Sequence, residues 1–108
     1  MFVTTLVYEL HPTTDPKAAK LFRAELVGRR YKEQWEGQPL PRTALWIRHT
    51  LEAEETVDDL RGRVGRDVRA AARAVRRAGL TLGVTSAWVH VMGGGTVGLV
   101  ELGDREDA

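Results

Sequence analysis

The stretch TVDDLRGRVGRDVRAAARAVRRAG, residues 56–79, decides the fold. Thr56 followed by Asp59 is close to a capping box, and Gly79 stands where a left-handed C-cap would end a helix. Apolar residues recur between them at spacings of three and four, namely Val57, Leu60, Val64, Val68, Ala71, Val75 and Ala78. This spacing predicts one long amphipathic helix whose narrow apolar stripe needs a partner, which we expect to be a sheet.

The opposite face of this helix is basic and carries Arg66, Arg69, Arg73, Arg76 and Arg77. The acids Asp58 and Asp59 lie in the first turn, so the charge order complements the helix dipole. We interpret this face as a solvated surface. The alternatives are an anion or nucleic-acid face, because guanidinium groups bind phosphates bidentately, and a face for a protein partner.

Gly62 and Gly65 fall within one turn of the same helix. Each glycine lowers helix stability by about 1 kcal/mol relative to alanine. The pair therefore indicates either the close approach of another backbone or a ligand, or a cost that the helix tolerates.

The chain has 108 residues, which predicts a single α+β domain over residues 1–102 followed by a flexible charged tail at 103–108. Its formal net charge of +1 excludes a global field that would attract nucleic acid or membranes. It contains no cysteine, which excludes disulfides and thiolate zinc sites. No basic segment precedes an apolar core at the N-terminus, and no apolar run approaches membrane-spanning length. We therefore expect a cytoplasmic protein without a membrane partner.

The remaining elements are read from turn residues and β-branched runs. The predicted strands cover residues 2–10, 31–35, 43–50, 84–92 and 96–102. Asp15-Pro16 is a typical helix start and predicts a helix from Pro16 to about Gly28, although residues 21–30 also alternate as a strand would. The two strands at 31–35 and 43–50 should form a hairpin around the proline-containing turn 36–41.

This order of elements is β-α-β-β-α-β with one further C-terminal strand. It matches the ferredoxin-like arrangement, in which both helices lie on one face of the sheet. A β-meander with one long helix is the alternative. Because the ferredoxin-like arrangement hosts many unrelated activities, the fold alone predicts no function.

Strand parity separates a core face from an open face. Leu45 and Ile47 are apolar and should face the core, so Trp46 and Arg48, which alternate with them, should face the opposite side of the sheet. The same argument places Trp88, His90 and Met92 opposite the core in the strand at 84–92. We expect these five residues to share one face, and an exposed patch of this kind is typical of a partner site.

Three occupants of the open face remain: a second copy of the chain, the bases of an RNA, and a small apolar ligand. The leading hypothesis is a non-catalytic binding or accessory module, a homodimer with an immunity, regulatory or assembly role. One alternative is a small cofactorless enzyme or ligand-binding dimer of the ferredoxin-like barrel kind. Nucleic-acid binding through the arginine-rich helix is the second alternative.

No motif in the sequence predicts a metal or a cofactor. His11 should lie at one end of the sheet and His49 and His90 at the other, so we expect no shared metal site. The run Gly93-Gly94-Gly95 precedes a strand rather than a helix and is typical of a turn, not of a phosphate loop. The Gly-x-Ser-x-Gly and His-Glu-x-x-His hydrolase motifs are missing. We therefore predict no catalytic residue, with His90 as the better candidate for an acid or base.

Overall fold

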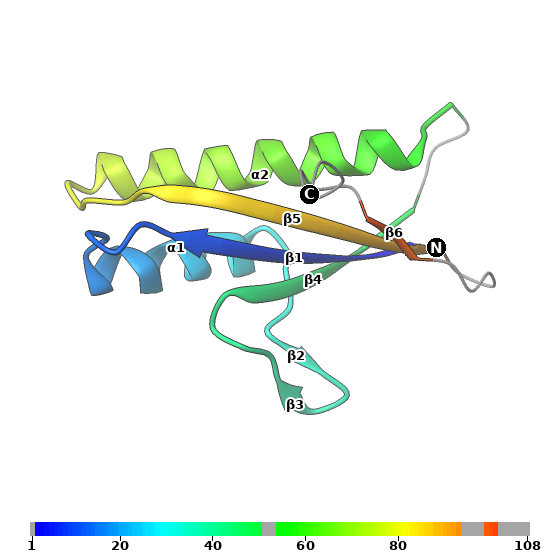
Figure 1. Cartoon of the computed structure of the whole chain (residues 1–108), viewed down its shortest axis with the longest axis horizontal. Helices are drawn as coiled ribbons and strands as arrows, with labels where there is room; N and C mark the ends of the chain where they lie inside the picture. The colour runs from blue at the N-terminus through cyan, green and yellow to red at the C-terminus, as the bar shows by residue number, and fades with distance from the viewer. Residues whose placement is uncertain (1, 51–53, 94–98, 102–108) are drawn as a thin grey trace.

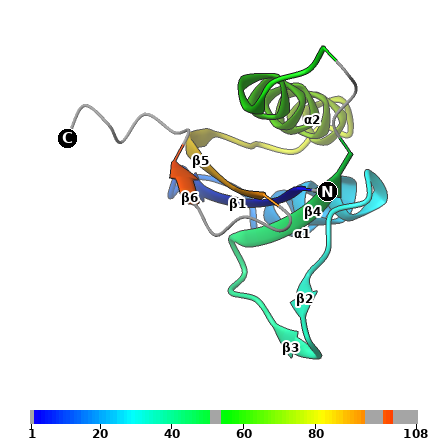
Figure 2. The same cartoon turned by 90° about the vertical axis from the view of Figure 1, so that its right-hand side faces the viewer.

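The computed structural model of the protein describes residues 2–50, 54–93 and 99–101. It shows an α+β architecture in which one antiparallel sheet, of strand order β4-β1-β5-β6, is covered on one face by two helices (Figure 1, Figure 2). The elements are β1 (Phe2–Leu10), α1 (Pro16–Gly28), β2 (Gln34–Trp35), β3 (Gln38–Pro39), β4 (Ala44–His49), α2 (Val57–Arg77), β5 (Val84–Gly93) and β6 (Leu99–Glu101). None of the helices in this part of the chain has the length and apolar character that crossing a bilayer requires.

Helix α2 confirms the helix predicted from residues 56–79. At its start the Thr56 backbone N–H donates to the Asp59 carboxylate at 2.8 Å. At its end Gly79 adopts a φ of 85°, the left-handed conformation that glycine adopts without strain. The residues that it buries are Leu60, Val64, Val68, Ala71, Ala72 and Val75. Ala78, the last member of the predicted stripe, is exposed because the helix ends before it.

Helix α1 settles the choice between helix and strand at residues 21–30. The Asp15 carboxylate accepts the backbone N–H of Lys17 at 2.8 Å, which is the predicted N-cap. Ala18, Phe22 and Leu26 form its buried side. Phe22 packs edge-on against Tyr8 of β1, with 5.0 Å between ring centroids.

The end of α1 is a Schellman motif with an arginine where glycine is usual. The N–H of Arg30 donates to Val27 O at 3.0 Å, and the N–H of Tyr31 donates to Leu26 O at 3.2 Å. Arg30 has a φ of 78°, in the left-handed region that disfavours side chains with a Cβ. Tyr31 follows and is buried, so it fixes the direction in which the chain leaves the helix.

The core lies between the sheet and the two helices. Thr4, Leu6 and Tyr8, alternate residues of β1, are buried there, and the residues of β4 and β5 that face the same side pack beside them. The strand residues in this core are Leu6, Tyr8, Leu45, Ile47, Val89 and Val91.

The strand predicted at residues 31–35 is wrong in most of its length. Lys32 forms a single bridge with Trp46 of β4. The chain then leaves the sheet, and Gln34–Trp35 pairs instead with Gln38–Pro39 in a small separate hairpin. Glu36 and Gly37, with φ values of 50° and 80°, form the two-residue turn of this hairpin, so residues 34–35 pair with 38–39 rather than with β4. The described strands therefore show an antiparallel α+β sheet but not the complete ferredoxin-like pairing.

The C-terminal strand predicted at 96–102 is present as β6, which pairs antiparallel with His90, Val91 and Met92 of β5. The predicted turn at Gly94-Gly95 and the predicted tail at 103–108 lie outside the described residues.

The two glycines of α2 do not meet another backbone. A Cβ added at Gly62 would find only the Arg66 guanidinium, at 3.8 Å, and one at Gly65 only that of Arg69, at 3.3 Å. Both neighbours are the ends of long, flexible side chains, so no other backbone of the described residues approaches these glycines. The approach of a ligand stays a prediction.

Replacing Gly62 by alanine should stabilise the protein. We expect Gly62→Ala to raise the free energy of unfolding by about 1 kcal/mol, the difference in helix propensity, and the melting temperature by roughly 4 °C. Thermal unfolding followed by circular dichroism measures this change. Gly79→Ala is the matched control, because its positive φ should make the same substitution destabilising. A melting temperature for Gly62→Ala below that of the wild type would contradict the conclusion that Gly62 lowers helix stability without a compensating contact.

Candidate functional site

The face of the sheet turned away from the helices is built from alternate residues of β4, β1 and β5. Cross-strand pairing arranges them in three rows: Arg48, Val3 and Met92; Trp46, Thr5 and His90; and Ala44, Val7 and Trp88. The structure thus brings together the five residues that strand parity assigned to an open face, to which β1 adds its own three and β4 adds Ala44. We call these nine residues the open face.

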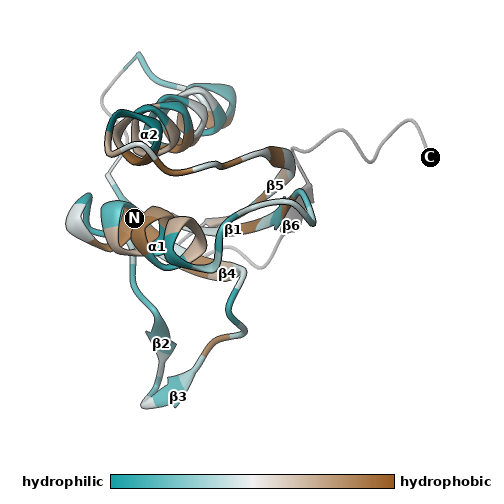
Figure 3. Ribbon diagram, turned by 90° about the vertical axis from the view of Figure 1, so that its left-hand side faces the viewer, coloured by the Kyte–Doolittle hydropathy of each residue, from teal (hydrophilic) through white to brown (hydrophobic). Residues whose placement is uncertain are grey.

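The open face is largely apolar at its centre. Val3 and Val7 of the central strand stand on either side of Thr5, and all three are partly accessible. Met92 is 41% exposed. A sheet face that is permanently in water normally alternates to polar residues at such positions. Hydrophilic residues predominate instead on the hairpin β2–β3 (Figure 3).

The hairpin β2–β3 projects from the β4 side of the sheet (Figure 1) and fixes Trp46 in place. The Trp46 Nε1–H donates to the Gln34 carbonyl at 2.5 Å. The rings of Trp35 and Trp46 meet edge to face with centroids 4.8 Å apart. The Arg48 guanidinium lies 5.2 Å from the centroid of the Trp46 ring, a cation–π distance. Sequence reasoning did not place Trp35 in this cluster, because the strand expected there is not formed.

A pocket of about 410 Å³ opens on the outer edge of β4, next to this cluster. It is lined by Arg30, Lys32, Trp46, Ile47 and Arg48. Trp46 lines this pocket beside three cations, and Trp88 and His90 are not among its lining residues. The three cations belong to the end of α1, the segment after it, and β4.

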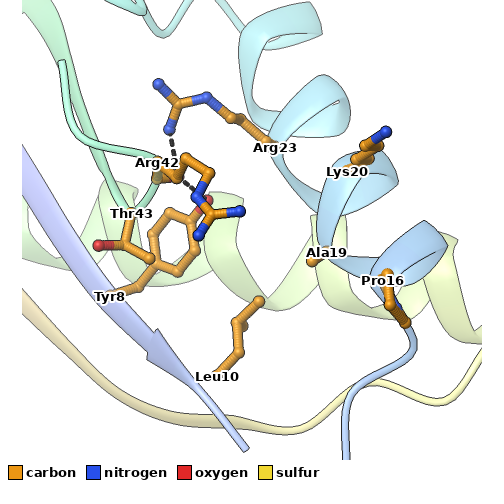
Figure 4. Close-up of a pocket in the computed structure, with 8 residues that line it drawn as sticks. All are labelled: Tyr8, Leu10, Pro16, Ala19, Lys20, Arg23, Arg42 and Thr43. Carbon is orange, nitrogen blue, oxygen red and sulfur yellow. Dashed lines mark hydrogen bonds between the residues drawn. The ribbon is translucent and has the colours of Figure 1, made fainter. Parts of the chain in front are cut away.

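A second pocket, of about 290 Å³, lies between α1 and the end of β1 (Figure 4). Its lining residues are Tyr8, Leu10, Pro16, Ala19, Lys20, Arg23, Arg42 and Thr43. The Tyr8 hydroxyl donates to the Arg42 carbonyl at 3.2 Å, and Arg23 donates to the same oxygen at 2.6 Å. Burial raises the pKa of Tyr8, so its hydroxyl stays protonated at neutral pH. The pocket therefore has an apolar wall and cationic side chains at its border.

The arginine face of α2 is exposed, as its spacing predicted, and consists of Arg66, Arg69, Arg73, Arg76 and Arg77. It belongs to the helix layer, on the other side of the sheet from the open face (Figure 2). Part of it has local structural contacts, since Arg76 Nε donates to the Leu82 carbonyl at 3.3 Å. The structure therefore does not join the arginine face and the tryptophans into one site.

A partly buried polar cluster where β4 meets α2 escaped sequence reasoning. His49 lies on the core face of β4, 8% exposed, and its Nε2 has no hydrogen-bond partner among the described residues. Nearby, the Tyr31 hydroxyl donates to Asp67 Oδ2 at 2.9 Å, and Arg63 forms an ion pair with Glu55. Burial lowers the pKa of His49, and the Arg63 charge lowers it further against the opposing pull of Asp67 and Glu55. Side chains alternate along β4, so the core positions of Leu45 and Ile47 would have predicted the buried position of His49.

The three histidines occupy different environments. His11 is exposed and bonded to Thr13, His49 is in the core, and His90 is on the open face. Within the described ranges we find no group of three or more His, Cys, Asp or Glu residues that could hold a metal ion. No protein-family model, curated protein or solved structure matches the chain.

Acidification should destabilise the protein through His49. Its pKa in the folded state lies below the ordinary value of 6.5, so the unfolded chain binds the proton first as the pH falls. Stability is then lost below pH 6.5, with a slope of at most about 1.4 kcal/mol per pH unit from one group. Melting temperatures between pH 7.5 and 5 should fall more steeply for the wild type than for His49→Leu.

The exposed His11 supplies the control for this measurement, and His11→Gln should keep the wild-type pH dependence. If His49→Leu lost stability on acidification as steeply as the wild type, the buried histidine would not be the titrating group.

Proposed function

We propose that the protein acts as a homodimeric, non-catalytic binding or accessory module in the cytoplasm, with the open face of its sheet covered by a second copy of the chain. The observation that carries this proposal is the position of Val3, Thr5 and Val7. They form the middle of a sheet face that neither helix covers, between strands that carry Trp46 and Trp88.

A second sheet suits this face better than a charged partner does. Two sheets pack face to face about 10 Å apart with interleaved side chains, and β-branched and aromatic residues fill that space well. A two-fold axis brings the same patch of both copies together, so the patch must complement itself. Apolar rows around Thr5 meet this requirement, and Arg48 at the corner of the face can stay at the rim of the interface.

The fold supports the same proposal. β1 is flanked by β4 and β5, both antiparallel to it, and the Lys32–Trp46 bridge stands where a further strand would pair with β4. We propose a ferredoxin-like arrangement whose second strand is reduced to this bridge. An uncovered face is a regular feature of such one-layer sheets, and self-association covers it.

A ligand-binding dimer or a small cofactorless enzyme is the second candidate. The pocket beside Tyr8 favours it, because an apolar wall next to a protonated hydroxyl and the cations Lys20 and Arg42 suits an apolar ligand with one anionic group. Co-purification of such a ligand would favour this candidate over a purely structural dimer.

The mass in solution tests the dimer. Light scattering after size exclusion should give twice the chain mass of 12.0 kDa for the wild type. Thr5→Arg should raise the dimer dissociation constant by at least about 100-fold, because it places a desolvated charge of each copy at the centre of the interface. The variant should keep its helical circular dichroism, since the Thr5 side chain lies outside the core.

Arg73→Glu on the exposed face of α2 is the matched charge control and should remain dimeric. A wild-type chain that stays at its single mass at high protein concentration would overturn the proposal, and so would a Thr5→Arg variant that dimerises as well as the wild type.

A further inference from the structure

We infer that the pocket on the outer edge of β4 binds a phosphomonoester carried on a flat ring, as in a nucleoside monophosphate. Its lining residues are Arg30, Lys32, Trp46, Ile47 and Arg48. The inference goes beyond the proposed dimer. Trp46 and Arg48 belong to the open face, and Arg30 and Lys32 complete the pocket at the outer edge of β4, beside the proposed interface.

No acid of the described residues forms an ion pair with a cation of this pocket. Three cations line one cavity, and none of them takes part in the ion pairs of the described residues. The acid nearest in sequence, Glu33, is paired with Arg23 at 2.9 Å. Like charges that share a cavity repel one another, and a bound anion relieves that repulsion.

The backbone of Arg30 points to the same function. It occupies the left-handed position of the Schellman motif, with a φ of 78°, where glycine would be unstrained. Strained residues of this kind persist where their side chain has a task, and they cluster at binding sites. The strained arginine here is also a wall of the cationic pocket.

The other walls are held in place before any ligand arrives. Lys32 and Trp46 exchange both backbone hydrogen bonds, at 2.7 and 3.2 Å, which sets the position of the Lys32 backbone beside β4. The Trp46 ring is fixed by Gln34 and by Arg48, as described above. Such preorganisation lowers the cost of binding.

The size and chemistry of the pocket select the ligand class. Its volume of about 410 Å³ lies within the range of roughly 300–1,000 Å³ that is typical of small-molecule sites. Guanidinium groups match the oxygens of a phosphate, which two arginines and a lysine can surround. The Trp46 ring supplies an aromatic wall against which a ring can pack. A bare inorganic anion would leave that wall unused.

Titration with AMP, adenosine and inorganic phosphate at low salt, followed by tryptophan fluorescence and calorimetry, tests the inference. We expect AMP to bind most tightly, phosphate more weakly, and adenosine weakest. The decisive variant is Arg30→Gly, which removes one cation and the backbone strain together. It should weaken AMP binding by roughly tenfold or more while the melting temperature stays the same or rises.

Arg73→Gly, at an exposed position of α2, removes an arginine remote from the pocket and should leave the AMP affinity unchanged. Lys32→Ala should weaken AMP binding as Arg30→Gly does. Light scattering on Arg30→Gly should give the wild-type mass, so the result is independent of the dimer proposal.

Three outcomes would overturn the inference: no saturable AMP binding by the wild type, adenosine binding as tightly as AMP, or an Arg30→Gly affinity equal to the wild type. A single-stranded RNA whose affinity grows with its length while AMP fails to bind would instead assign the cations to nucleic acid.

Discussion

The packing of α2 and α1 on one set of alternate β1 residues is the constraint on which the rest of the structure depends. Leu6 and Tyr8 can be buried only if their neighbours Thr5 and Val7 face the other way. Because both helices occupy the same layer, no helix of the described residues covers the second face of the central strand. The apolar character of that face is not required by the core and comes from Val3 and Val7 of β1 together with the tryptophans of the flanking strands.

The second organising feature is the turn that ends α1. Tyr31 is buried and donates its hydroxyl hydrogen bond to Asp67 of α2, so it anchors the chain between the helices. One residue later Lys32 reaches the edge of β4, and the hairpin β2–β3 then carries Trp35 against Trp46. The cationic pocket and the fixed tryptophan pair thus depend on a single reversal of direction at Arg30.

The polar cluster around His49 combines a neutral imidazole with charged neighbours. His49 must stay neutral in the core, while Arg63, Glu55 and Asp67 surround it with opposing charges. Such groups add little to stability compared with an apolar replacement, because removing them from water is costly. They make the stability of the region where β4 meets α2 sensitive to the protonation state of His49.

The sequence by itself determined most local elements: both ends of α2, the N-cap of α1, the extent of β1, and the parity that groups Trp46 with Trp88. These depend on short-range rules of capping, periodicity and alternation, which act within a few residues. The sequence left residues 21–30 open between helix and strand. It could not determine that residues 31–35 leave the sheet after one bridge, or that Trp35 meets Trp46. Nor could it show that Arg30 and Arg48, 18 positions apart in number, share a pocket. These features were decided only by the tertiary structure, because they arise where segments distant in sequence compete for the same edge and the same buried space.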